Sequence, residues 1–132
     1  MRRRVLAYVT RERHGRTELL VFDDRAHRHS GTQVPAGRLD PGETLEQCLL
    51  RELHEEAGLE RVTVVRELGT WNTRYENHAF EVHIDGGETA DTWKHVVRGD
   101  GDDAGLVFNY RWEPVRADLR LFGRIDPMLE TL

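Results

Sequence analysis

Three glutamates, Glu52, Glu55 and Glu56, occupy positions i, i+3 and i+4 of the one segment that strongly predicts an α-helix, residues 44–57. At about 100° per residue, this spacing places three carboxylates on consecutive turns, within an arc of about 100°. Like charges at this spacing repel by roughly a few tenths of a kcal/mol per pair. Carboxylate oxygens suit Mg²⁺, which proteins usually hold with few carboxylates and the phosphates of a substrate. One interpretation of the pattern is therefore a site for a divalent cation.

A solvated acidic face without a function is the other interpretation, and it is common on helices. The apolar arc of the same segment covers roughly 140°. It contains Leu45, Leu49, Leu50, Leu53 and Ala57. The acidic arc overlaps the edge of this apolar arc instead of lying opposite it. Ionised groups at the margin of a core require partners, and this favours the cation site.

The residues before the helix predict a shaped loop. Residues 33–43 contain Pro35, Gly37, Pro41 and Gly42, so we expect no regular structure there. Glycine allows a positive φ or a close approach of the backbone to a ligand. This places a flexible backbone segment directly next to the glutamates.

The ends of the helix and its attachment to the loop can also be predicted. Thr44 and Gln47 fit a capping box, and Gly58 fits the residue just past the C-terminus. Glu43 lies about two turns before Arg51, so an ion pair between them could fasten the loop onto the helix. Cys48 lies among leucines and is interpreted as a buried apolar residue.

Strands are expected on both sides of this helix. Apolar runs and alternation predict strands over residues 5–10, 17–23, 62–70, 79–84 and 106–112. The first two form a hairpin around His14-Gly15. Polar loops are expected over residues 24–31 and 85–105, the second interrupted by a short segment at 93–97, and a short helix is expected near the end of residues 119–132. The pattern is typical of a mixed α/β or α+β domain.

Length and composition limit the class of protein. The chain has 132 residues, of which 38% are hydrophobic and 33% charged, so we expect a single domain over residues 1–132. No segment resembles a membrane span or a targeting signal, and a single cysteine agrees with a reducing compartment. We therefore expect a cytoplasmic protein that does not bind membranes. The net charge of -5 disfavours broad affinity for nucleic acids.

Gly37, Glu43 and the run Arg51–Leu59 together resemble the Nudix box, which they match at every defined position. The chain is therefore similar to the Nudix hydrolases. The resemblance implies an α/β fold, an α/β/α sandwich with a mixed β-sheet and a central catalytic loop and helix. The sequence reads Val34-Pro35-Ala36-Gly37 where many members have two glycines, a departure that affects the wall of the pocket and leaves the box intact.

The resemblance also implies an activity and roles for the box residues. Nudix hydrolases typically cleave a nucleoside diphosphate linked to another moiety, using Mg²⁺ or Mn²⁺. By similarity, Glu52, Glu55 and Glu56 would ligate the metal together with the carbonyl of Gly37. Glu43 and Arg51 would orient the helix within the catalytic site.

Family members differ in the residue that serves as general base. By analogy, Glu52 is the first choice. Acids of the loop over residues 85–105 are alternatives, although each could equally be a solvated loop residue: Glu88, Asp91, Asp100, Asp102 and Asp103.

The substrate is defined less closely than the reaction. Nucleoside triphosphates, dinucleoside polyphosphates and nucleotide sugars are all compatible with the box. Tyr75 lies near the position of a tyrosine that is a feature of dinucleoside polyphosphate hydrolases, whereas the proline of ADP-ribose enzymes and the coenzyme A signature are missing. Arg38 and Arg74 could contact phosphates. Trp71, Tyr75, Trp93 and Trp112 could stack on a base or belong to the core.

Other classes of function are compatible with the same fold. A nucleotide-binding sensor with weak catalysis is one, but such domains usually lose a box carboxylate and this chain keeps them all. An enzyme acting on the 5′ ends of RNA is another, disfavoured by the absence of an obvious basic patch. A homodimer is possible by analogy with similar proteins.

Overall fold

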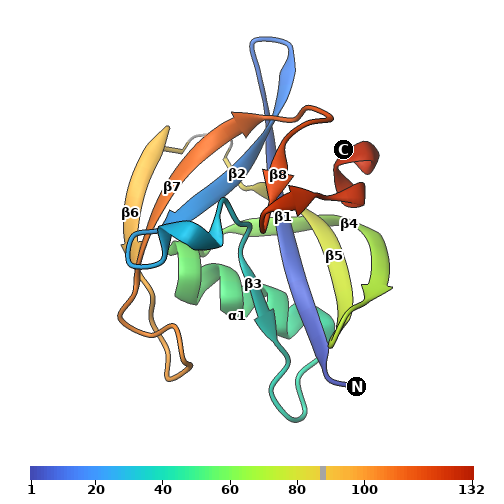
Figure 1. The fold of residues 1–132 in the computed structure, drawn as a ribbon, viewed down its shortest axis with the longest axis vertical. Helices are drawn as coiled ribbons and strands as arrows, with labels where there is room; N and C mark the ends of the chain where they lie inside the picture. The colour runs from blue at the N-terminus through green and yellow to red at the C-terminus, as the bar shows by residue number, and fades with distance from the viewer. Residues whose placement is uncertain (87–88) are drawn as a thin grey trace.

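A mixed β-sheet of seven strands forms the centre of the molecule (Figure 1). The computed structural model describes residues 1–86 and 89–132. The strands of the sheet are β1 (Arg3–Arg13), β2 (Arg16–Asp24), β3 (Ala36–Arg38), β4 (Val62–Asn72), β5 (Glu76–Ile84), β6 (Thr92–Val96) and β7 (Val107–Pro114). Their order is β4-β5-β1-β2-β7-β6, with β3 also paired to β1. β1 and β5 are parallel, and the other pairs are antiparallel.

β1 is buried on both faces because both faces of the sheet are covered. Val5, Ala7 and Val9 pack into a core shared with the helix α1 (Leu45–Ala57). Leu6 and Tyr8 pack into a second core with the C-terminal segment. This segment forms the short strands β8 (Arg120–Leu121) and β9 (Arg124–Ile125) and the 3-10 helix η2 (Pro127–Thr131). The expected mixed α/β class is confirmed; among the described residues, α1 covers one face and the C-terminal segment with η2 covers the other.

The two ends of α1 follow the local sequence signals. The Thr44 hydroxyl accepts a hydrogen bond from the backbone N–H of Gln47 at 3.1 Å, and the Gln47 side chain accepts one from the N–H of Thr44 at 3.0 Å. At the other end, Gly58 has the left-handed conformation, with φ of 72°, which glycine adopts without a steric penalty. The predicted helix and both of its caps are confirmed.

The expectation of no regular structure over residues 33–43 is wrong. Ala36–Arg38 form β3, which pairs with the first part of β1, Leu6 opposite Ala36 and Arg4 opposite Arg38. The two prolines lie outside this pairing and do not interrupt it. β1 pairs with β3 near its start and with β2 near its end, from Thr10 onward. β1 thus changes its antiparallel partner along its length, and β3 lies beside Glu52 and Glu56 of α1.

The remaining elements agree with the sequence in kind and differ in length. β1, β2, β4 and β7 extend beyond the predicted strands, and β5 begins at Glu76, before the predicted start at residue 79. The hairpin between β1 and β2 turns at His14 and Gly15, both with positive φ. β6 occupies the short segment expected within residues 85–105, and a 3-10 helix, η1 (Arg28–Ser30), lies in the first polar loop. In the described part of the chain, no helix has the length and apolarity needed to span a membrane.

Candidate active site

The three glutamates of α1 lie at the margin of the core, as their helical positions predict. Glu56 is buried, at 5% exposure. The side chains of Glu52 and Glu55 are only 13% and 24% exposed. All three lie on the last two turns of the helix, where the backbone dipole carries partial negative charge and favours a cation over an anion. The interpretation as a freely solvated acidic face is therefore wrong.

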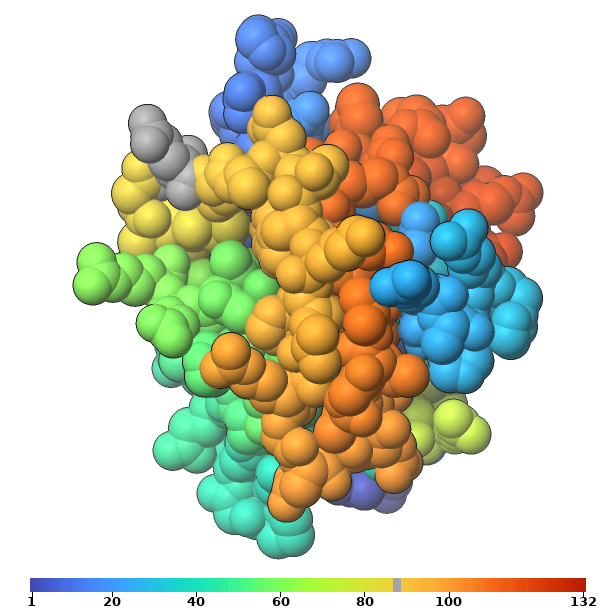
Figure 2. Space-filling model, turned by 90° about the vertical axis from the view of Figure 1, so that its left-hand side faces the viewer, coloured from blue at the N-terminus to red at the C-terminus, as the bar shows by residue number. Residues whose placement is uncertain are grey.

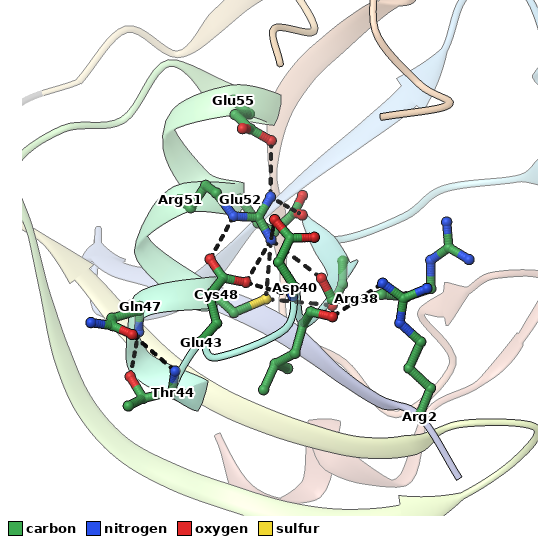
Figure 3. A network of polar contacts seen from close by, with 12 residues as sticks. Arg2, Arg38, Asp40, Glu43, Thr44, Gln47, Cys48, Arg51, Glu52 and Glu55 are labelled. Atoms are coloured by element: carbon green, nitrogen blue, oxygen red, sulfur yellow. Dashed lines mark hydrogen bonds and ion pairs between the residues drawn. The ribbon is translucent and has the colours of Figure 1, made fainter. Parts of the chain in front are cut away.

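Arg51 joins the helix glutamates to the preceding loop (Figure 3). Its guanidinium donates two hydrogen bonds to Glu43, Nε to Oε2 at 2.7 Å and Nη2 to Oε1 at 2.9 Å. Nη1 donates to Glu52 at 2.9 Å and to Glu55 at 3.1 Å. Nη2 also donates to the backbone carbonyl of Arg38 at 3.2 Å. The predicted ion pair of Glu43 with Arg51 is present, and it belongs to a larger network.

Gly37 is placed where a side chain would displace Glu52. A Cβ atom built on Gly37 would lie 2.1 Å from the Cδ atom of Glu52. A side chain there would push the Glu52 carboxylate away, so glycine allows this carboxylate to lie directly against the backbone of β3. The loop and the helix are thus in contact at the two residues that the sequence singled out.

Burial and neighbouring charges shift the pKa values of these carboxyl groups. Burial, together with the adjacent Glu52 carboxyl group, raises the pKa of Glu56 well above its ordinary value. Burial also raises the pKa of Glu55, against the opposing effect of Arg51. Hydrogen bonds from Arg51 lower the pKa of Glu43 to about 2. Burial thus disfavours the ionised forms of Glu55 and Glu56, and an additional positive charge would stabilise those forms.

Three side chains that the sequence did not assign to the site hold the C-terminal end of α1. The Tyr110 hydroxyl donates to the carbonyl of Glu56 at 2.8 Å, and His95 Nε2 donates to that of Glu55 at 2.8 Å. Trp93 Nε1 donates to the carbonyl of Ala57 at 3.1 Å. These bonds satisfy carbonyls that the helix leaves free and fix the turn that carries the glutamates. The only sequence signal for these three supporting side chains was the alternation of aromatic and polar residues in β6 and β7.

The donor chemistry of the site fits a hard divalent cation. Glu52, Glu55 and Glu56 supply carboxylate oxygens, and Gly37 supplies a nearby backbone carbonyl, the oxygen ligands that Mg²⁺ and Mn²⁺ prefer. Among residues 1–86 and 89–132, no three such side chains already converge on one point, because Glu52 and Glu55 turn toward Arg51. Arg51 contacts Glu52 through Oε1 and Glu55 through Oε2, and the other oxygen of each carboxylate makes no hydrogen bond to Arg51.

A cleft of about 420 Å³ lies over these glutamates. We call it the carboxylate cleft. Besides Gly37, the three glutamates and Arg51, it is lined by Arg2, Arg38, Asp40, Arg74, Tyr75 and the loop that follows β6. This loop forms one continuous ridge with β6 in Figure 2, beside the segment of α1. The N–H of Arg98 donates to the carbonyl of Glu55 at 2.9 Å, which holds the loop to the helix.

The structure separates the loop acids that the sequence proposed as alternative bases. Asp100, Asp102 and Asp103 line the carboxylate cleft. Asp91 pairs instead with Arg11 and Arg13, outside the cleft. Glu88 lies outside the described residues.

A second hollow, the aromatic pocket, opens beside the cleft with a volume of about 250 Å³. It is lined by residues of β1, of the β4–β5 turn and of the C-terminal segment, among them Arg4, Trp71, Arg74, Tyr75, Phe122 and Asp126. A third, smaller hollow connects the two and shares Arg4, Arg74 and Tyr75 with the aromatic pocket and Gly37 and Glu56 with the cleft. The predicted substrate residues Arg38, Arg74 and Tyr75 are thus brought together with the glutamates.

The four aromatic residues proposed for base stacking divide into two pairs. Trp71 and Tyr75 line the aromatic pocket. Trp93 stacks on Tyr110, with ring centroids 5.1 Å apart, and belongs to the support of α1. Trp112 lies under the guanidinium of Arg11, 4.3 Å from its ring centroid, and lines neither the cleft nor the pocket. Phe122 and Arg4, which the sequence did not assign to the site, complete the pocket.

Curated relatives show similarity to parts of the chain. An RNA pyrophosphohydrolase of Legionella pneumophila is 51% identical over 41 residues, which cover 31% of this chain and 23% of the relative. An RNA pyrophosphohydrolase of Brucella abortus is 31% identical over 101 residues, covering 66% of this chain and 56% of the relative. The chain thus spans between about a quarter and just over half of the length of these relatives.

Solved structures show the same fold. A C. elegans Ap4A hydrolase in a binary complex matches with a TM-score of 0.60 and 18% identity, over 87% of this chain and 81% of that one. A second C. elegans Ap4A hydrolase structure matches with a TM-score of 0.58 and 17% identity, over the same shares of the two chains. At this level of identity the likeness concerns the fold. The model of the Nudix domain matches residues 1–125, and together with the loop and helix described above it shows that the chain belongs to the Nudix family.

Proposed function

We propose that residues 1–132 form a single Nudix hydrolase domain that hydrolyses the diphosphate linkage of a nucleotide with the help of Mg²⁺, which Mn²⁺ could replace. The observation that carries the proposal is that Glu52, Glu55, Glu56 and Gly37 line one cleft, with the Glu52 carboxylate directly against Gly37. Nucleoside triphosphates, dinucleoside polyphosphates and nucleotide sugars are the substrate classes that we expect.

Each part of the site has a role in this reaction. Glu52, Glu55, Glu56 and the carbonyl of Gly37 would hold the metal. When bound, the ion neutralises phosphate charge and lowers the pKa of a bound water molecule. Glu43 and Arg51 keep α1 in register with the loop, through the two hydrogen bonds between them.

The chemical step is a displacement at phosphorus. Water attacks one phosphorus atom, and the bond from that atom to the bridging oxygen breaks. The bridging oxygen leaves with the electron pair as part of the second phosphate. By analogy with the family, Glu52 is the group that takes the proton of the water. Asp100, Asp102 and Asp103 are the alternative bases on the loop side of the cleft.

The substitution Glu55→Gln tests the metal role. It removes one anionic oxygen and keeps the volume, so we expect metal-dependent turnover to fall by at least about 100-fold while circular dichroism and melting temperature show a folded protein. Glu46→Gln is the matched control, an exposed glutamate on the first turn of the same helix. Full activity of Glu55→Gln would show that Glu55 is not a metal ligand.

A substrate screen with Mg²⁺ and Mn²⁺ separates the enzyme from a nucleotide sensor. It includes nucleoside triphosphates, dinucleoside polyphosphates, nucleotide sugars, ADP-ribose and a 5′-triphosphorylated oligoribonucleotide. The oligoribonucleotide is included because arginines, which attract phosphates, line the carboxylate cleft and the aromatic pocket. These are Arg2, Arg4, Arg38, Arg74 and Arg124. Tight binding of one compound without hydrolysis of any would favour the sensor.

A further inference from the structure

Arg4 carries a charge that no acidic side chain among the described residues balances. Its side chain is partly buried beside the aromatic pocket, and its Nε atom is buried without a hydrogen-bond partner. The charges that act on it include Glu56 at a distance and the like charge of Arg74. A buried charge without a partner costs free energy. Since the fold retains this cation, its natural partner is an anion from outside the chain.

Aromatic rings offset only part of this cost. The Arg4 guanidinium carbon lies 5.3 Å from the ring centroid of Phe122 and 5.9 Å from that of Tyr75. Arg74 lies 5.2 Å from the same Tyr75 ring. A cation–π contact contributes about 0.5–2 kcal/mol, whereas removing an ion from water costs several kcal/mol. Two guanidinium groups thus share one aromatic ring, and both remain available for an anion.

Their position indicates what kind of anion it is. Arg4 and Arg74 line both the aromatic pocket and the hollow that connects it to the carboxylate cleft. A ligand that places an aromatic group in the pocket and a diphosphate at the glutamates must pass these two residues. In a nucleotide, the group at this point is the phosphate attached to the nucleoside.

We propose that Arg4, together with Arg74, binds the phosphate group nearest the nucleoside, so that the chain recognises a nucleoside 5′-phosphate with its base in the aromatic pocket. This inference rests on the proposed function for the direction of the substrate. In this role Arg4 positions the substrate and so determines which of its phosphorus atoms lies at the glutamates. Guanidinium groups suit this task because they grip phosphate oxygens with paired hydrogen bonds.

Binding of nucleoside monophosphates without metal tests the proposal. In EDTA, NMR titration compares AMP with adenosine for the wild type and for Arg4→Gln. We expect Arg4→Gln to weaken AMP binding about tenfold, the effect of losing a charged hydrogen bond, and to leave adenosine binding unchanged. GMP, CMP and UMP should lose affinity by the same factor, because the contact reads phosphate and not the base.

The matched control is Arg3→Gln, which removes a neighbouring positive charge of β1 on the exposed side of the strand. It should bind AMP like the wild type. Equal losses for AMP and adenosine in Arg4→Gln, no loss for either, or no measurable AMP binding by the wild type would overturn the proposal.

Two further variants keep the test decisive if Arg4→Gln folds poorly. Arg4→Lys retains the charge without the planar guanidinium and should bind AMP with intermediate affinity. Arg74→Gln should weaken AMP binding and leave adenosine binding unchanged.

Hydrolysis assays separate the two proposals. If Glu55→Gln loses turnover while Arg4→Gln and Arg74→Gln bind AMP like the wild type, the proposed hydrolase activity stands. The proposed phosphate site is then wrong. Arg4-dependent AMP binding without hydrolysis of any diphosphate would retain the phosphate site and reject the hydrolase.

Discussion

Glu56 is the most buried of the three glutamates of the site. It is almost fully buried, next to a second carboxyl group, and its nearest backbone donor, the N–H of Ala36, lies 3.5 Å from its Oε1 atom. A bond of this length contributes little. When a carboxyl group in this position is ionised, it destabilises the folded protein. A role in ligand binding is the physical reason to retain such a residue.

The raised pKa of Glu56 predicts that the metal-free protein loses stability with rising pH. The folded protein binds this proton more tightly than the unfolded chain does. Its contribution to stability is therefore complete below the ordinary value of 4.5 and is lost as the pH rises through the raised pKa. Glu56→Gln removes this dependence, so at pH 8 in EDTA its melting temperature should exceed that of the wild type by about 3 °C or more.

Differential scanning fluorimetry from pH 5 to pH 8 measures this effect. Glu46→Gln, on the solvent side of the same helix, should follow the wild-type curve. A Glu56→Gln protein that melts at or below the wild-type temperature at pH 8 would contradict the prediction.

At the scale of elements, the site is a joint between a strand, a loop and a helix. β3 brings Gly37 to Glu52, and the loop that follows returns to α1 through Glu43 and Arg51. At the opposite end of the helix, β6 and β7 hold its carbonyls through Trp93 and Tyr110. α1 is thus fixed at both ends by residues that are distant in sequence.

The pair of Glu43 and Arg51 should stabilise the protein above acidic pH. The pKa of Glu43 is lowered to about 2, so its contribution is present above 4.5 and is lost as the pH falls toward 2. Glu43→Gln should lower the free energy of unfolding at pH 7 by roughly 1–3 kcal/mol. Urea denaturation at pH 7 and at pH 2.5 measures this, and the difference from the wild type should shrink at the lower pH. A difference that does not change with pH would assign the effect to packing.

The sequence predicted the elements whose signals are local. α1, its capping box and the glycine that ends it depend on residues within one or two turns, and all were found where predicted. β3 was missed because its pairing partner on β1 lies far away in the chain, and the surrounding prolines and glycines suggested a loop. Ala36–Arg38 contain no proline, so they form a strand once β1 offers an edge for pairing.

In the candidate site, too, residues with a local sequence signal were predicted and residues brought together only by the fold were not. The glutamates, Gly37, Glu43 and Arg51 have a fixed spacing along the chain, and this spacing made them predictable. The sequence did not single out Arg4, because its position near Tyr75 and Phe122 depends on three segments that meet only in the fold. His95, Trp93 and Tyr110 were missed as supports of α1 for the same reason.

At the scale of the whole molecule, one buried contact ties the C-terminal segment to the sheet. The hydroxyl of Tyr8, in the middle of β1, donates a hydrogen bond to Asp126 Oδ2. Asp126 also accepts a bond from the backbone N–H of Met128 at 2.9 Å, at the start of η2. Since Asp126 and Phe122 both line the aromatic pocket, this contact keeps one wall of the pocket in place.

Tyr8→Phe should loosen this wall. The substitution leaves the Asp126 carboxylate buried without its donor, so we expect a loss of about 1–3 kcal/mol in the free energy of unfolding. Hydrogen exchange should increase over residues 119–132 more than elsewhere. Tyr110→Phe is the comparison, since it removes a buried hydroxyl beneath α1 and should spare that segment. Unchanged exchange over residues 119–132 in Tyr8→Phe would show that the segment is held by packing alone.

The parallel pairing of β1 with β5 has a consequence for how the chain folds. Arg3 pairs with Glu76 and Val9 with Val82, so the most buried strand of the sheet finds one of its partners only after more than half of the chain has been synthesised. Until then, the apolar run of β1 has a hairpin partner in β2 and an open edge on the other side. Pairings between segments so far apart in sequence are closed slowly, because the loop between them must lose entropy first. The strand that carries Arg4 and Tyr8 is therefore synthesised well before the strand that completes its pairing.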